Sequence, residues 1–163
     1  MNQHEAFMKE AIAQAVLGDA KNEVPVGAVV VLDGKIIGRG FNQPISSNDP
    51  CAHAEVVALR DAACSLQNYR LVNADLYVTI EPCTMCAGAI VHGRIRRVIY
   101  GASEPKAGVV HSQQNIFQES YFNHRVEVLS GVLAQECSDV MQAFFQRRRE
   151  EKKALKLANK ENQ

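Results

Sequence analysis

Residues 74–91 have the sequence ADLYVTIEPCTMCAGAIV, which joins a strand pattern directly to a helix pattern. Ala74–Ile80 is apolar and rich in β-branched residues, which predicts a buried strand. Pro82 then predicts the start of a helix, because the first helical turn does not need the N–H group that proline lacks. That helix carries Cys83 and Cys86. A strand that leads straight into a helix is the repeating unit of α/β proteins.

The rest of the chain follows the same alternation. Apolar pairs predict a helix over residues 7–18, and Asp33-Gly34 predicts a hairpin turn between strands at 24–32 and 35–41. Further elements are a helix at 53–65, strands at 97–100 and 126–129, and a C-terminal helix at about 132–160. We therefore expect a three-layer α/β/α sandwich in which helices flank a five-stranded mixed sheet.

Length and composition favour one folded domain spanning residues 1–163. The chain has 163 residues, of which 47% are hydrophobic and 22% are charged, so intrinsic disorder is excluded. No apolar run approaches the ~18 residues that span a membrane. The N-terminus lacks the basic and apolar regions of a secretory signal, so we expect a cytoplasmic protein without membrane contact.

The overall charge is balanced, with 18 basic and 18 acidic residues. Residues 147–163 are the exception, because they hold seven basic and three acidic side chains, a net charge of +4. This segment begins with Arg147, Arg148 and Arg149. It is either the solvated end of a helix or a segment that contacts phosphates.

Two short motifs suggest a metal site. His53-Ala54-Glu55 and Pro82-Cys83-Thr84-Met85-Cys86 each stand at the predicted start of a helix. One imidazole and two thiolates supply three ligands for a tetrahedral Zn²⁺ ion, and the open fourth position suits water. A catalytic zinc is therefore favoured over a structural one. Cys51 could compete as a ligand only if the chain folded back.

Glu55 lies close to the predicted metal without needing to bind it. A carboxylate there can take a proton from zinc-activated water and return it to a leaving group. The combination H-x-E and P-C-x-x-C is the signature of zinc deaminases. Of the five cysteines, Cys64 and Cys137 lie on apolar helical stripes, which predicts that both are small core residues.

Over about residues 7–153, the chain resembles the cytidine deaminase-like superfamily and, more narrowly, the bacterial tRNA adenosine deaminases of the TadA type. The zinc motifs are common to the superfamily, and the flanking blocks favour the tRNA branch. These blocks are residues 23–28, 40–42, 49–50, 68–71, 77–83, 86–89, 101–102, 123–125 and 144–145.

The resemblance implies hydrolytic conversion of adenosine to inosine at the wobble position of a tRNA anticodon, with an arginine tRNA as the expected substrate. It also implies a homodimer in which each active site borrows residues from its neighbour. In this pattern His53, Cys83 and Cys86 hold zinc and Glu55 shuttles the proton. The resemblance also implies three substrate-binding residues. The Asn42 side chain hydrogen-bonds the purine, the Ala54 backbone helps to hold it at the metal, and Val26 forms an apolar wall.

The same resemblance assigns RNA contacts outside the metal site. Glu104 stands where relatives usually have Asp, a residue expected to contact the sugar-phosphate backbone. Gln146 stands where some relatives have Arg. The expected contacts are completed by Phe144, Phe145, Arg147, Arg148 and Arg149. His111 has no assigned role and is expected to lie in a surface loop.

Other functions stay open at this level. A deaminase of a free nucleoside, nucleotide or base, such as cytidine, deoxycytidylate or guanine, would share the zinc motifs. Many cytidine deaminases have a cysteine where this chain has His53, which counts against that branch. A non-catalytic, zinc-stabilised RNA-binding module would not need Glu55, and a thiol–disulfide protein would use Cys83 and Cys86 without a metal.

Overall fold

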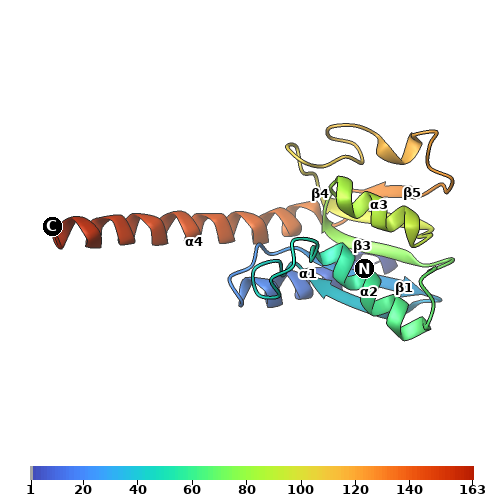
Figure 1. Ribbon diagram of the computed structural model, residues 1–163, viewed down its shortest axis with the longest axis horizontal. Coiled ribbons are helices and arrows are strands. Elements are labelled where there is room, and N and C mark those ends of the chain that lie inside the picture. The colour runs from blue at the N-terminus through green and yellow to red at the C-terminus, as the bar shows by residue number, and fades with distance from the viewer. Residues whose placement is uncertain (1) are drawn as a thin grey trace.

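The computed structural model describes residues 2–163 and contains one sheet with the strand order β2-β1-β3-β4-β5 (Figure 1). The expected five-stranded α/β/α sandwich is confirmed. In chain order, the elements are α1 (Gln3–Asp19), β1 (Gly27–Leu32), β2 (Lys35–Phe41), α2 (Ala54–Leu66), β3 (Asp75–Ile80), α3 (Thr84–His92), β4 (Arg97–Ala102), the 3₁₀ helix η1 (Ile116–Gln118), β5 (Glu127–Ser130) and α4 (Ala134–Glu161).

The sheet is mixed, as expected. β1 runs antiparallel to both β2 and β3, whereas β3, β4 and β5 are parallel to one another. The hairpin between β1 and β2 turns at Asp33 and Gly34, whose φ angles are 51° and 75°. Positive φ at both positions is what a two-residue hairpin turn requires, so the Asp-Gly pair sets the register of β2.

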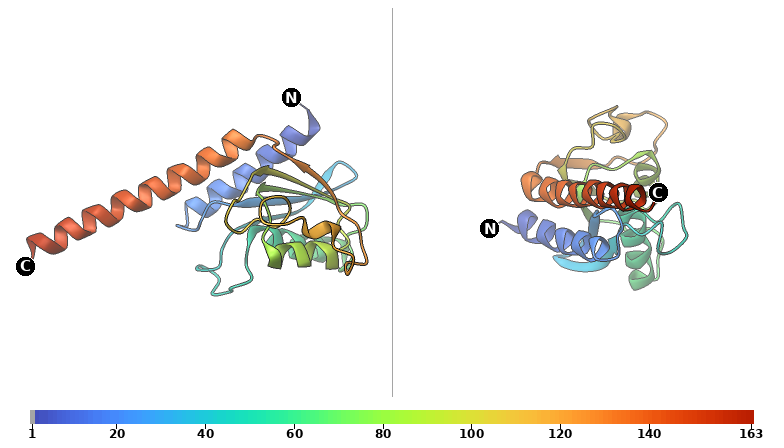
Figure 2. Two further views of the ribbon diagram at one scale, coloured as in Figure 1. Left: turned by 90° about the horizontal axis from the view of Figure 1, so that it is seen from above. Right: turned by 90° about the vertical axis from the view of Figure 1, so that its left-hand side faces the viewer.

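Both faces of the sheet are covered, which explains the continuous apolar runs of the strands. Alternate residues of β1 point to opposite faces: Ala28 and Val30 pack with α2 and α3, and Val29 and Val31 pack with α1. Figure 2 shows α1 and α4 on one face and α2 and α3 on the other. The helices that begin with the two predicted metal motifs therefore share one layer.

Two glycines of β2 let α2 lie unusually close to the sheet. A Cβ atom at Gly40 would come within 2.6 Å of the Ala54 carbonyl oxygen, and a Cβ at Gly38 would collide with the Ala58 carbonyl. Only glycine allows this approach, because any side chain would push the helix away. The close contact fixes the start of α2, where His53 lies, against the strand that leads to Asn42.

The helix α4 leaves the body of the protein after its first few turns (Figures 1 and 2). Cys137 and Phe144 are buried, but every residue from 149 to 163 is exposed. With 28 residues, α4 is ~42 Å long. The basic C-terminal segment therefore extends into solvent as a continuous helix.

Some local expectations were wrong. Cys64 is exposed, because the outer surface of α2 continues past its apolar stripe, whereas Cys137 is buried as expected. β1 begins at Gly27 instead of Val24, and α3 begins at Thr84 because Cys83 is its N-cap residue and has an extended backbone. None of the helices within residues 2–163 has the length and apolar character that a membrane crossing requires.

Candidate metal centre and active-site cavity

The two motifs meet at the starts of α2 and α3. His53 is the N-cap residue of α2 and Cys83 is the N-cap residue of α3, both in extended backbone conformation. Neither side chain caps its own helix, so both are available to a ligand. Cys86 lies one turn into α3. Residues from distant parts of the sequence are thus brought together at the carboxyl end of β3, where α/β proteins commonly build their sites.

The three side chains have the geometry of a zinc site. Nδ1 of His53 lies 3.6 Å from Sγ of Cys83 and 3.5 Å from Sγ of Cys86. In a tetrahedral site with Zn–N of about 2.0–2.1 Å and Zn–S of about 2.3 Å, the nitrogen and sulfur atoms lie ~3.6 Å apart. All three donor atoms lie within 4.8 Å of one another. The group therefore fits one zinc ion without rearrangement.

Glu55 is in direct contact with this group. The Sγ atom of Cys86 lies 3.3 Å from Oε2 of Glu55, whose side chain is 3% exposed. Burial raises the pKa of this carboxyl group. A group that can hold a proton this close to the metal suits a carrier that alternates between its acidic and basic forms.

The thiols differ in their proton affinity. The hydrogen bond from Cys86, together with the backbone N–H groups of Cys86 and Met85, lowers the pKa of Cys83 to about 5. Cys86 donates this hydrogen bond to Cys83 and is buried, and both effects raise the pKa of its thiol. Cys83 is therefore a thiolate at neutral pH, which is the form that binds a metal.

A cavity of about 220 Å³ opens beside the metal group. Asn42, which directly follows β2, and Val26, from the segment before β1, both line this cavity. Ala54 is fully buried at the start of α2, where its backbone N–H has no partner within the helix. The remaining lining residues are Val24, His53, Glu55, Ile80, Glu81, Cys83, Glu104, Ala107 and Met141.

Comparison with known proteins identifies the family. The family model described as the cytidine and deoxycytidylate deaminase zinc-binding region matches residues 1–102. A tRNA-specific adenosine deaminase from Haemophilus influenzae is 54% identical over 153 residues, which cover 93% of this chain and 88% of that protein. The enzyme of the same name from Bacillus subtilis is 46% identical over 156 residues, covering 96% and 97%. The chain belongs to the tRNA-specific adenosine deaminase family.

A solved structure supports this assignment. It comes from a study of A-to-I editing by tRNA:A34 deaminases at the wobble position of transfer RNA. That chain is 45% identical to this one and superposes with a TM-score of 0.81, covering 83% of this chain and 98% of that one. The protein is thus a zinc-binding deaminase, and His53, Cys83 and Cys86 form a group that could hold the zinc ion.

In this deaminase a second groove adjoins the catalytic cavity, and Val24 lines both. The groove has a volume of about 280 Å³ and brings together four of the expected RNA-contacting residues, Phe144, Phe145, Arg148 and Arg149. Phe144 is buried, whereas Phe145 is 42% exposed. Asn22, Ile45 and Lys152 complete its lining. An exposed aromatic ring beside basic side chains suits a nucleic-acid base and its phosphate.

Arg147 does not line this groove. Its guanidinium group bonds to Asp19 at the end of α1, with 2.6 Å between Nη2 and Oδ1, and lies 3.7 Å from the Glu151 carboxylate. The three consecutive arginines therefore separate in space, because successive helical residues face different directions. Arg148 and Arg149 face the groove, and Arg147 ties α4 to α1.

Glu81, which directly precedes Pro82, has a role that the sequence did not predict. Its buried carboxylate accepts hydrogen bonds from the backbone N–H groups of Glu104, Val110, His111 and Ser112, and from the Ser112 hydroxyl group. Although burial raises the pKa of Glu81, the hydrogen bonds from His111 and Ser112 hold it below its usual range. Glu81 thus fixes the loop that carries Glu104 into the cavity.

Glu23 anchors the loop on the other side of the cavity in the same way. It is 1% exposed and accepts hydrogen bonds from the backbone N–H groups of Ile45 and Ser46 and from the Ser46 hydroxyl group. A buried glutamate cannot be distinguished from an exposed one by residue type. The only signal was its position next to the apolar residues 24–32.

Two expectations concern residues near the site. Cys51 is exposed and does not belong to the metal group within the described residues. His111 lies in the loop after β4, as expected, and its Nδ1 atom is 2.6 Å from the Tyr100 hydroxyl group. His111 therefore helps to fix the same loop that Glu81 holds.

Proposed function

We propose that this protein converts adenosine to inosine at the wobble position of a tRNA anticodon, with an arginine tRNA as its substrate. The observation that carries the proposal is the contact between Glu55 and a metal group of zinc geometry, at the wall of a cavity that continues into a basic, aromatic groove. The names of the relatives support the choice of tRNA.

The reaction needs water and a proton carrier. When bound, zinc acts as a Lewis acid and lowers the pKa of water to about 7. Glu55 accepts the proton of the attacking water and delivers it to the adenine ring nitrogen beside the amine-bearing carbon. The same carboxyl group then helps ammonia to leave, so adenosine and water give inosine and ammonia.

The neighbouring residues hold the base for this attack. The Asn42 amide can hydrogen-bond the purine, the Ala54 backbone N–H is free to bind it, and Val26 packs against its face. A base within a stack cannot reach the cavity, so the nucleotide must be extruded. A loop base is already partly unstacked, which makes a single-stranded anticodon loop a favourable substrate.

We propose that the enzyme acts in the cytoplasm as a homodimer. The layer formed by α2 and α3 has an apolar pocket of about 340 Å³ that Ala63, Tyr69 and Ala89 help to line, and Tyr69 is 70% exposed. Burial of such a surface stabilises association. Light scattering of the zinc-loaded protein should give twice the chain mass, whereas a monomer at micromolar concentration would contradict this part of the proposal.

The function is tested by incubating the protein with total tRNA and sequencing the products for adenosine-to-inosine conversion. We expect conversion at the wobble position of an arginine tRNA. Glu55→Ala protein serves as the control for contaminating activity. Release of ammonia from free cytidine or guanine without tRNA conversion would establish the alternative, a deaminase of free nucleosides or bases.

A further inference from the structure

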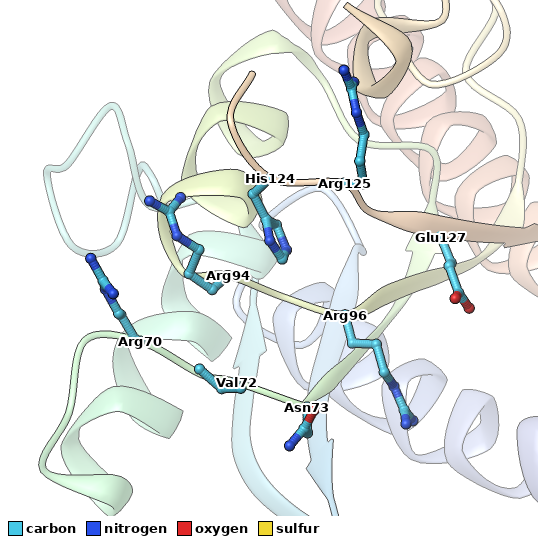
Figure 3. A pocket seen from close by; sticks show the side chains of 8 residues that line it. All are labelled: Arg70, Val72, Asn73, Arg94, Arg96, His124, Arg125 and Glu127. Atoms are coloured by element: carbon cyan, nitrogen blue, oxygen red, sulfur yellow. The ribbon is translucent and has the colours of Figure 1, made fainter. Parts of the chain in front are cut away.

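Figure 3 shows the residues that line a second cavity, of about 380 Å³. This cavity lies where β3, β4 and β5 begin, whereas the metal group lies near the end of β3. Its walls come from the segments that precede β3, β4 and β5. β3 begins here and ends near the metal, so its six residues separate the two cavities by ~20 Å. The lining residues are Arg70, Val72, Asn73, Arg94, Arg96, His124, Arg125 and Glu127.

This arginine cavity has a net positive charge, because four arginines and one glutamate, Glu127, line it. Arg96 is neutralised by Asp75, to which it donates two hydrogen bonds of 3.0 and 2.8 Å. Within residues 2–163, no carboxylate forms an ion pair with the other three lining arginines, Arg70, Arg94 and Arg125. Arg125 donates hydrogen bonds to the carbonyl groups of Phe117 and Glu119 and points away from the other labelled arginines (Figure 3). Arg70 and Arg94 therefore supply the local anion-attracting charge in a chain that is neutral as a whole.

The backbone conformation at Arg94 supports a role for its side chain. Arg94 follows the end of α3 with a φ of 59°, in the left-handed region where glycine is favoured. Its Nη1 atom donates one hydrogen bond of 2.9 Å to the Val91 carbonyl. A guanidinium group has five N–H donors, so most of them are left for a ligand.

His124 adds a further donor. Its Nε2 atom lies 2.7 Å from the carbonyl oxygen of Ile95, so this nitrogen carries a proton. Nδ1 is the other ring nitrogen and can also donate when the ring is protonated.

We propose that the arginine cavity binds a phosphate group of the RNA backbone, at a position remote from the nucleotide in the catalytic cavity. Planar guanidinium groups match the oxygens of a phosphate in paired hydrogen bonds. The volume accommodates a phosphodiester together with part of its sugar. The choice of RNA as the source of the phosphate rests on the proposed function, whereas the affinity for phosphate does not.

The test compares two charge-matched double variants of the zinc-loaded protein. Arg70→Ala/Arg94→Gly removes two arginines of the cavity, and glycine suits the left-handed backbone at position 94. Lys35→Ala/Arg39→Ala removes the same charge from exposed positions on β2. The affinity for tRNA is measured at several salt concentrations, with zinc content and thermal midpoint as checks of the fold.

We expect the cavity variant to reduce the slope of log K against log salt by about 0.7–0.9 for each phosphate that its arginines no longer neutralise. The β2 variant should keep the wild-type slope. Equal slopes for both variants, in a protein that still deaminates tRNA, would overturn the proposal while the proposed function stands.

Inorganic phosphate separates the two possible sources of the ligand. In the wild type, phosphate should shift the imidazole resonances of His124, and this shift should disappear in the cavity variant. If the phosphate shift disappears but tRNA affinity is unchanged, the site takes free phosphate and the RNA assignment is overturned. If tRNA is not a substrate at all, the phosphate response still tests the anion site alone.

Discussion

The Sγ atom of Cys86 and the Oε2 atom of Glu55 lie 3.3 Å apart, so a metal ligand and the proposed proton carrier are in direct contact. Cys86 is in the first turn of α3 and Glu55 is in the first turn of α2. Both helices begin at the same cavity, and both starts are fixed by packing against the sheet. The position of the carboxylate relative to the metal is therefore set by the fold.

Replacement of Glu55 by alanine should abolish deamination and leave zinc binding intact. Glu55 is not one of the three ligands, and positioned acid–base groups contribute ~10²–10⁴-fold to rate. Single-turnover deamination of RNA and zinc analysis of the same preparation measure the two properties. Near wild-type activity in the variant would exclude Glu55 as the proton carrier.

Removal of any metal ligand should release the zinc. His53→Ala, Cys83→Ala and Cys86→Ala each leave two ligands, which hold zinc poorly. Atomic absorption should show about one zinc per chain in the wild type and far less in each variant. Cys51→Ala is the matched control, because this cysteine is exposed outside the group and its replacement should leave the zinc content unchanged. Full zinc retention in all three ligand variants would rule out this site.

Replacement of Glu81 by glutamine should loosen the loop formed by residues 103–112. The amide nitrogen of glutamine cannot accept hydrogen bonds, so buried N–H groups of the loop lose their acceptor. Each unsatisfied group costs about 1–3 kcal/mol in the free energy of unfolding. Hydrogen exchange should accelerate in this loop, and KM for RNA should rise.

A glutamate outside the site provides the control for Glu81. Glu10→Gln alters an exposed carboxylate on α1 and should change neither exchange nor KM. Glu81→Asp keeps the carboxylate and should have an intermediate effect. If loop exchange in Glu81→Gln equals that of the wild type, Glu81 does not hold the loop.

The arginines after the phenylalanine pair should have separate effects. Arg148→Ala/Arg149→Ala removes two basic residues from the groove and should weaken tRNA binding and reduce its salt dependence. Arg147→Ala breaks the ion pair with Asp19, a partly exposed bond worth ~0–1 kcal/mol of stability. It should leave tRNA affinity nearly unchanged. An equal decrease of tRNA affinity in the Arg148→Ala/Arg149→Ala and Arg147→Ala proteins would show that tRNA binding does not depend on which arginines line the groove.

The sequence was sufficient to predict the layers of the fold and the metal group, because both depend on local patterns. The strand runs, the Asp-Gly turn and the two short motifs at residues 53–55 and 82–86 can each be recognised within a few residues. The exposure of Cys64 was not predictable, because the width of the covered face of α2 depends on its neighbours.

The supports of the site depend on contacts between distant segments, which no local pattern reveals. Glu81 bonds to residues 23 to 31 positions away, and Glu23 bonds to residues 22 and 23 positions away. The separation of Arg147 from Arg148 and Arg149 likewise depends on where α1 ends. Residue type was enough to identify candidates for metal binding and proton transfer. Only the fold shows that other glutamates, Glu81 and Glu23, hold the loops around the cavity.

The choice of tRNA as the substrate is tested most directly by comparing kcat/KM for an anticodon stem-loop that carries adenosine at the wobble position with kcat/KM for free adenosine. Both substrates offer the same base, but only the stem-loop can use the groove beside the cavity, and binding energy from such remote contacts positions the reacting base. We expect a much higher kcat/KM for the stem-loop, with inosine found at the wobble position. Comparable values for the two substrates would contradict it.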